Sequence, residues 1–451
     1  MTLEETVRAQ QPAVLADLAR LVGVPSVSAD PARADQVQAS ASMAVALLTQ
    51  LGCPDVQVVR AGTGQPAVIA RFPAPPGQPT VCLYAHHDVQ PEGDLALWSS
   101  APFEATVRED RLFGRGTADD KGGLAVHLAA LRAFDGRPPV GVTLFLEGEE
   151  EIGSPTLAAL LEEHREALAA DVFVIADSAN WAVGQPAFTT SLRGFADCVV
   201  ELRTLDHALH SGSYGGVVPD ALTSLCRLLA TLHDDRGDVA VAGLATMDPP
   251  DLEYPEDRLR AESGVLDGVQ QIGTGSVVER LWCKPALTVI ALDATPVARA
   301  SNTLAPVARA KINLRLAPNE DAAAALDKLA QHLRDHAPWG AQVEVLEPET
   351  GSPSTIAFAG PHAEVARTAF RRAWGVDPVF IGQGGSIPMV ADFGRAFPDA
   401  TILVTAVGDP DTRAHGIDES LHLGDFAAAC TAEALLLQGL ADLAEGASTG
   451  G

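Results

Sequence analysis

The chain has 451 residues, of which 47% are hydrophobic and 20% charged, so it can form about two or three domains with substantial cores. Acidic residues outnumber basic ones by 59 to 31, which gives a formal net charge of -28 at pH 7. That charge repels phosphate backbones and anionic lipid headgroups, so neither a nucleic acid nor a membrane is an expected partner. No apolar run approaches the roughly 20 residues that cross a bilayer.

Cysteine usage and the N-terminal segment bear on the cellular compartment. The six cysteines are scattered and include no C-x-x-C pair, which is typical of isolated thiols in a reducing environment. The first residues, MTLEETVRAQQ, lack the basic and apolar regions of a secretory signal and fit a helix start with a capping box. We therefore expect a cytoplasmic protein.

Both ends of the chain show the pattern of an α/β domain. Short apolar runs rich in β-branched residues are bounded by turn residues, and helical patterns lie between them. Such runs suit the buried strands of a mostly parallel sheet that helices cover on both faces. The expected strands are 81–85, 142–146, 172–176 and 401–407, and the expected helices are 3–22, 34–51 and 426–443.

The middle of the chain has a different pattern, of strands and helices in the order β-α-β-β-α-β, which is typical of a ferredoxin-like α+β unit. The expected strands are 195–203, 287–291, 308–316 and 342–346, and the expected helices are 219–232 and 321–334, with an acidic insertion at 238–284. We therefore predict one α/β domain, made of residues 1–192 and 353–451, that a smaller α+β domain of residues 193–352 interrupts.

Imidazoles and carboxylates follow the predicted buried strands at the points where these strands end. His86, His87 and Asp88 follow the first strand, the run EGEEE follows the second, Asp177 follows the third, and the loop after the fourth leads to His415. Ligands of open α/β sheets bind beyond the carboxyl ends of the strands, so these side chains are expected at one edge.

Such an acid-rich edge predicts a metal site. Crowded carboxylates without enough Lys or Arg to pair them repel one another, and a divalent cation relieves that repulsion. Mixed sets of imidazole and carboxylate ligands suit zinc, and they also accept manganese or cobalt. The glycine-rich turn 114–122 adds the adjacent Asp119 and Asp120 to this inventory.

Seven features along the chain resemble, in order, those of the co-catalytic zinc peptidase family. They are YAHHDVQP, GRGTADDKGG, EGEEEIGS, the Asp after VFVIA, LHSGSYGG, GGSIP and GDPDTRAHG, and they span residues 84–415. That family includes carnosinase-type cytosolic dipeptidases, carboxypeptidase G-type enzymes and amino-acid deacylases. The resemblance implies a di-zinc metallopeptidase with a catalytic domain and a lid and dimerisation domain, the latter at 193–352.

The resemblance also implies a ligand set for two divalent ions. Asp119 bridges the two ions, His86 and Asp177 complete the ligands of one ion, and Glu151 and His415 complete those of the other. Taken alone, each pattern has a plainer explanation: HHD is more often a surface turn, EGEEE a solvated helix start, and an Asp after a strand a turn cap.

Further roles in the predicted catalytic domain follow from the same resemblance. Glu150 is implied as the general base of hydrolysis, and the pattern E-G-x-E-E-x-G-S selects it over Glu149. Asp88 is implied to orient the imidazole of His86. The peptide bond between Asp119 and Asp120 is expected to be cis, whereas His87 is expected to play no part in metal binding.

The smaller domain contributes candidates for substrate contacts. The resemblance implies that His210 reaches the active site of a partner subunit and polarises the scissile carbonyl, which in turn implies a homodimer. Asn302 and Arg315 resemble a clamp for the substrate carboxylate, although a strand arginine is more often paired on a surface. Ser386 in GGSIP is expected to line the same pocket.

These expectations define a reaction and its alternatives. The main hypothesis is metal-dependent hydrolysis of the peptide bond of dipeptides or short peptides. It is favoured because Asp177 and the motifs HSGSYGG and GGSIP resemble the dipeptidase branch of the family. The alternative is an N-acyl-amino-acid amidohydrolase of the deacylase or desuccinylase type. A metal-binding or scaffold protein without catalysis is a third possibility, against which the complete set of expected acids and imidazoles argues.

Overall fold

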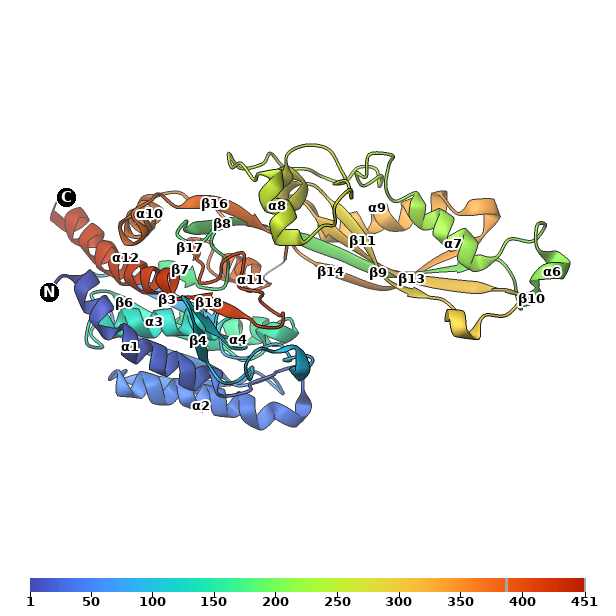
Figure 1. Ribbon diagram of the computed structural model, residues 1–451. Helices are drawn as coiled ribbons and strands as arrows, with labels where there is room; N and C mark the ends of the chain where they lie inside the picture. Colours follow the sequence, from blue (N-terminus) through green and yellow to red (C-terminus); the bar gives the residue numbers. More distant parts are fainter. Residues whose placement is uncertain (386–387, 450–451) are drawn as a thin grey trace. The chain divides into compact units, whose positions relative to one another are not determined.

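The computed structural model describes residues 1–385 and 388–449 of the chain (Figure 1). The chain divides into two compact units. The larger unit comprises Met1–Thr190, Ile356–Ile381 and Pro388–Gly451, and the smaller comprises Ser191–Thr355 and Gly382–Ile387. The described residues 382–385 therefore group with the smaller unit, whereas the predicted boundaries assign them to the larger one.

A mixed sheet forms the centre of the larger unit. Within the described residues it has nine strands in the order β1-β2-β6-β3-β7-β17-β8-β15, with β16 also paired to β8. Strands β6, β3, β7 and β17 run parallel to their neighbours in this group, and antiparallel strands flank them. The bounds are β1 (Asp55–Val59), β2 (Ala67–Phe72), β3 (Thr80–His86), β6 (Gly141–Glu147), β7 (Val172–Ile175), β8 (Ala187–Leu192), β15 (Ser354–Thr355), β16 (Val379–Gln383) and β17 (Thr401–Val404).

Helices cover both faces of this sheet, and alternation along β3 shows why residues 81–85 of the strand are all apolar or aromatic. Leu83 joins the core that includes residues of α1, α3 and α12. Its neighbour Tyr84 instead packs against the rings of Phe145 and Phe393, the latter on α11. The predicted fold class, a helix-covered sheet with a parallel centre, is confirmed. The helices are α1 (Leu3–Val22), α2 (Ala34–Gln50), α3 (Lys121–Ala133), α4 (Leu157–Glu163), α5 (Arg165–Leu168), α10 (Pro361–Trp374), α11 (Pro388–Ala396) and α12 (Leu423–Thr449).

The last helix corrects one expectation from the sequence. Its segment Leu423–Ala447 has a mean hydropathy of 1.3 over its most apolar window and is long and apolar enough, by those criteria alone, to cross a membrane. However, 61% of that window is buried inside the protein, where α12 packs against α1, α3 and α10. Burial among other helices explains the apolar composition of α12, since a helix that is hydrophobic on most sides fits the core of a large protein.

The smaller unit contains an antiparallel sheet with the strand order β11-β13-β9-β14 in its described residues. Along the chain these strands follow one another as β9, β11, β13 and β14. Their order in the sheet is the one expected of a ferredoxin-like unit. Helices α7 and α9 pack against the sheet, and Asp220 caps α7. The bounds are β9 (Gly194–Arg203), α6 (Ser211–Tyr214), α7 (Ala221–Ala230), α8 (Glu256–Ser263), β11 (Ala286–Asp293), β13 (Val307–Leu316), α9 (Ala322–Asp335) and β14 (Gln342–Gly351).

Two small sheets adjoin segments that carry predicted site residues. In the larger unit, β5 (Arg111–Phe113) pairs with both β4 (Thr106–Arg108) and β18 (Ser420–His422), and β18 follows the loop of His415. In the smaller unit, β10 (Leu209–His210) pairs with β12 (Thr303–Leu304).

Candidate metal centre

The carboxyl ends of three parallel strands bring the predicted ligands of the larger unit together. His86 is the last residue of β3, Glu150 and Glu151 follow β6, and Asp177 follows β7. Ligand atoms of His86, Glu150 and Asp177 lie within 4.8 Å of one another, and so do those of His86, Asp119 and Glu151. The edge of the sheet therefore carries two overlapping groups of metal-ligating side chains.

The carboxylate of Asp119 faces two different imidazoles. Its Oδ1 lies 3.1 Å from Nε2 of His86, and its Oδ2 lies 3.0 Å from Nε2 of His415. The same nitrogen of His415 lies 3.2 Å from Oε2 of Glu151. A carboxylate with one oxygen toward each half of a cluster has the geometry that a bridge between two cations requires.

The loop of His415 has an unusual backbone. His415 has a φ of 62°, and Arg413 and Asp418 have φ values of 56° and 57°. Non-glycine residues in this left-handed region are costly and concentrate at functional sites, where the surrounding structure holds them. The conformation of this loop directs the imidazole of His415 at Asp119 and Glu151, although His415 lies far from both in sequence.

The pKa values of the acids in the cluster indicate a deficit of positive charge. Burial, together with the nearby Asp119 and Glu151, raises the pKa of Asp177 to about 7. Burial and the neighbouring acids also raise the pKa of Glu150 well above its ordinary value. Among the described residues, the ion-pair partners of Asp119 and Glu151 are histidines rather than Lys or Arg. A set of imidazoles and carboxylates with this deficit fits divalent cations such as zinc or manganese.

Asp88 supports the cluster from behind. Nδ1 of His86 lies 3.0 Å from the carbonyl oxygen of Asp88 and 3.4 Å from its Oδ1. The carboxylate of Asp88 also accepts the backbone N–H groups of Glu150, at 3.3 Å, and of Glu151, at 3.1 Å. Asp88 therefore holds both the ring of His86 and the turn that presents the two glutamates.

The peptide bond between Asp119 and Asp120 is cis, which confirms the prediction. Asp120 itself caps α3 by accepting the N–H of Gly123, and its other oxygen accepts the N–H of His86 at 3.2 Å. The side chain that follows Asp119 thus ties the glycine-rich turn to the end of β3.

The two residues set aside from the metal site have structural partners. The carboxylate of Glu149 accepts hydrogen bonds from the backbone of Gln65 and from both the N–H and the hydroxyl of Thr156. His87 is buried, its Nε2 donates to the carbonyl of Pro66, and burial lowers its pKa to about 4, so its ring is neutral. Neither side chain belongs to the groups of potential ligands.

Sequence reasoning missed a buried ion pair that holds the loop of Asp119. The carboxylate of Glu419 accepts a hydrogen bond of 2.6 Å from Arg115 and further ones from the N–H groups of Gly116, Ala118 and Asp119. Arg115 in turn donates to the carbonyl oxygens of Pro91 and Gly416. Arg115 stands in the motif GRGTADDKGG, but a single sequence does not reveal that its partner lies 304 residues away.

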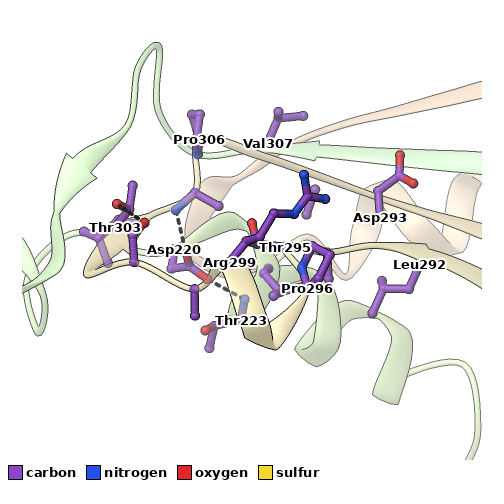
Figure 2. Close-up of a pocket in the computed structure, with 17 residues that line it drawn as sticks. Asp220, Thr223, Leu292, Asp293, Thr295, Pro296, Arg299, Thr303, Pro306 and Val307 are labelled. Carbon is purple, nitrogen blue, oxygen red and sulfur yellow. Dashed lines mark hydrogen bonds between the residues drawn. The ribbon is translucent and has the colours of Figure 1, made fainter.

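In the smaller unit, the structure brings His210 and Asn302 together. His210 pairs with Thr303 across β10 and β12, and the carbonyl oxygen of Asn302 accepts the N–H of Ser211 at 2.9 Å. His210 and Asn302 are both exposed. Thr303 also lines a cavity of about 950 Å³ in this unit, where Asp220 joins the backbones of Thr223 and Ala305 (Figure 2).

The strand order separates Asn302 and Arg315, the two residues that the resemblance pairs as a clamp. Asn302 precedes β13, whereas Arg315 is the second-last residue of that strand and stacks its guanidinium 5.7 Å from the ring centroid of Phe195. At about 3.3 Å per residue, Arg315 lies about 26 Å along the strand from Val307. The length of β13 therefore lies between the two residues in one chain. Ser386 lies outside the described residues.

Comparisons with known proteins agree with this picture. Residues 82–439 match the model of "Peptidase family M20/M25/M40". The chain is 35% identical over 437 residues to the cysteinylglycine-S-conjugate dipeptidase of Corynebacterium striatum, with 94% of each chain covered. It is 26% identical to the Cys-Gly metallodipeptidase DUG1 of Saccharomyces cerevisiae, with 95% of each covered.

A solved structure shows the same fold. The crystal structure of human carnosine dipeptidase 1 superposes with a TM-score of 0.81 at 23% identity and covers 98% of both chains. The predicted resemblance is thus confirmed by the family match, by relatives that extend over nearly the whole chain and by the architecture. The chain belongs to peptidase family M20/M25/M40 and is a metallopeptidase.

Proposed function

We propose that this chain hydrolyses the peptide bond of dipeptides with two bound zinc ions and with Glu150 as the general base. The position of Asp119 between the imidazoles of His86 and His415 carries this proposal. His86, Asp119 and Asp177 would hold one ion, and Asp119, Glu151 and His415 the other. Manganese or cobalt would suit the same donors.

Bound divalent ions would supply Lewis-acid chemistry at this edge, polarising a carbonyl and acidifying a water. Glu150 supplies the proton transfers. Its carboxylate belongs to the group formed with His86 and Asp177, and burial raises its pKa, both of which favour proton uptake from the attacking water. Glu150 then delivers that proton to the leaving amine. Asp88 holds the backbone of Glu150 in place for both steps.

Dipeptides of the Cys-Gly type are the first substrates to consider. Relatives of this chain include a cysteinylglycine-S-conjugate dipeptidase, a Cys-Gly metallodipeptidase and a β-Ala-His dipeptidase. Arg315 offers a guanidinium that suits the terminal carboxylate of a dipeptide, and Ser386 is proposed to contribute to the same pocket. His210 is proposed to polarise the scissile carbonyl, with Asn302 beside it.

A homodimer formed by the smaller unit fits these assignments, and this unit would act as the lid and dimerisation domain. His210 and Asn302 lie at one end of β13 and Arg315 at the other, so two chains are the simplest way to bring both groups to one substrate. The edge strand β11 exposes Val289, Ile290 and Leu292 by 39%, 53% and 44%. The opposite edge, β14, carries Glu344, Glu347 and Glu349, and charged side chains on an edge strand discourage pairing.

The cytoplasm is the proposed compartment. All six cysteines lie in the described residues and are free thiols, which suits a reducing environment.

A substrate panel tests the proposed function. Purified protein reconstituted with zinc would be assayed on Cys-Gly, an S-conjugate of Cys-Gly, β-Ala-His, and N-acetyl and N-succinyl amino acids. The proposal predicts turnover of dipeptides, with no comparable rate on the acyl amino acids, and predicts that Glu150→Gln lowers that turnover by about 10²- to 10⁴-fold. Faster hydrolysis of the acyl amino acids would favour the deacylase alternative, and no hydrolysis of any compound would overturn the proposal.

A further inference from the structure

Gln90 makes three hydrogen bonds to a single residue, Glu151. Its backbone N–H donates to Oε1 of Glu151 at 3.0 Å, and its side-chain Nε2 donates to Oε2 at 2.8 Å and to the carbonyl oxygen of Glu151 at 3.1 Å. Gln90 stands in the motif YAHHDVQP, four residues after His86, and none of the roles above uses it. Both oxygens of the Glu151 carboxylate therefore have a donor from the same residue.

These bonds decide which part of the carboxylate remains available. Each carboxylate oxygen can accept about two hydrogen bonds or ligand bonds. Oε1 is turned toward the backbone of Gln90, while Oε2 also lies 3.2 Å from Nε2 of His415. Gln90 thus leaves Oε2 as the atom that faces His415 and Asp119.

The chemistry of the side chain suits this position. The amide of Gln90 donates hydrogen bonds without adding negative charge to a cluster in which burial and nearby acids already raise the pKa of Asp177 and Glu150. A glutamate at position 90 would have the same shape, but it would repel Glu151. Asp88 accepts the backbone N–H of Glu151, so Asp88 fixes the main chain of this residue while Gln90 fixes its side chain.

We propose that Gln90 is a positioning residue that holds Oε2 of Glu151 ready for the divalent ion shared with Asp119 and His415. This inference rests on the proposed function, because it assumes that Glu151 is a ligand. Fixing the rotamer of Glu151 before the ion binds reduces the entropy that binding must overcome. Gln90 therefore sets the affinity of one of the two ion positions and not of the other.

A zinc titration tests the proposal. The metal-free protein would be titrated with zinc against a chromophoric chelator, for the natural chain, for Gln90→Met and for Gln90→Glu, with Gln57→Met on the exposed face of β1 as a matched control. We expect Gln90→Met to weaken one of two binding steps by about 10- to 100-fold. The other step and the melting temperature of the metal-free protein should stay at the values of the natural chain.

Double variants separate positioning from a general structural role. In a Glu151→Gln background, Gln90→Met should cause no further loss of zinc affinity, because the carboxylate that it positions is gone. In an Asp177→Asn background, it should still weaken the remaining ion. Two unchanged binding steps in Gln90→Met, or an equal loss in both backgrounds, would overturn the inference. If the natural chain itself bound no zinc and hydrolysed no dipeptide, the proposed function would fail with it.

Discussion

The two units of the chain present their functional candidates in different ways. In the larger unit, His86, Glu150, Asp177 and Asp119 gather from separate segments at one sheet edge, where His415 joins them. In the smaller unit, His210 and Asn302 lie at one end of β13 while Arg315 lies at the other. The proposed metal centre is therefore complete within one unit, whereas the proposed substrate contacts are not.

This difference follows from topology. Parallel strands end at a common edge, so short loops after β3, β6 and β7 deliver side chains to one place without help from another chain. An antiparallel sheet sends the ends of successive strands to opposite sides. Residues such as His210 and Arg315 at the two ends of such a sheet can serve one substrate only if a further element, such as a second chain, joins them.

The largest effect is expected from a substitution in the proposed metal centre. Glu150→Gln should lower kcat for dipeptide hydrolysis by about 10²- to 10⁴-fold, because the base that accepts the proton is lost. Zinc content should stay that of the natural chain, as should the activity of the control Glu162→Gln on the exposed side of α4. An active Glu150→Gln variant would mean that another residue is the base.

Mixing two inactive variants tests whether one active site takes residues from two chains. His210→Ala alone should lower kcat by about 10²- to 10³-fold, because it removes a donor to the carbonyl oxygen. When His210→Ala and Glu150→Gln chains are mixed and allowed to exchange, about a quarter of the natural activity should return, since half of the dimers then contain one intact site. His207→Ala, an exposed neighbour, serves as the control. A mixture without any activity would contradict an active site shared between chains.

The buried pair of Arg115 and Glu419 should contribute strongly to stability as well as to metal binding. Arg115→Met leaves the carboxylate of Glu419 buried with three backbone donors but without its cation. Breaking such a pair costs about 3–5 kcal/mol, which urea unfolding of the metal-free protein would measure. A loss below about 1 kcal/mol would contradict the structural importance assigned to this pair.

A smaller and pH-dependent effect is expected from a histidine outside the cluster. His127 is buried in the larger unit; its Nδ1 bonds both carboxylate oxygens of Glu433 and its Nε2 bonds the carbonyl of Tyr84. Burial opposes its protonation, but Glu433 raises its pKa above the ordinary value. Both ring nitrogens of His127 thus have partners, and neither partner belongs to the candidate metal centre.

The raised pKa fixes the direction of the pH dependence. Because the unfolded His127 titrates near 6.5, the pair contributes its full stabilisation below about pH 6.5 and loses it as the pH rises through the higher folded-state pKa. Glu433→Gln should therefore lower the free energy of unfolding by about 2 kcal/mol at pH 6 and by less at pH 9. The same loss at both values would show that His127 is neutral in the folded protein. Chelators should not change this difference.

Much of the candidate metal centre was predictable, because the sequence shows the buried strands and the residues that follow them directly. His86, the end of β6 and Asp177 fall where the pattern predicts, and so does the cis bond after Asp119. The supporting bonds were not predictable in the same way. Glu419 and Gln90 act through hydrogen bonds of backbone N–H groups and side chains, whose partners depend on how loops fold together.

Two other features also needed the structure. The bonds of Glu149 to Thr156 needed the structure, because the sequence pattern sets Glu149 apart from Glu150 but does not show what Glu149 contacts. The separation of Asn302 from Arg315 follows from the length and direction of β13. The apolar stretch of α12 was underestimated because Glu433, Gln438 and Asp442 interrupt it, although the helix as a whole is apolar.

Anomalous diffraction from crystals grown with zinc would test the central claim most directly. We predict two peaks about 3.5–4 Å apart at the sheet edge, both within ligand distance of Asp119, one beside His86 and Asp177 and the other beside His415 and Glu151. A single peak, or peaks that do not contact Asp119, would contradict the account of a centre that holds two ions.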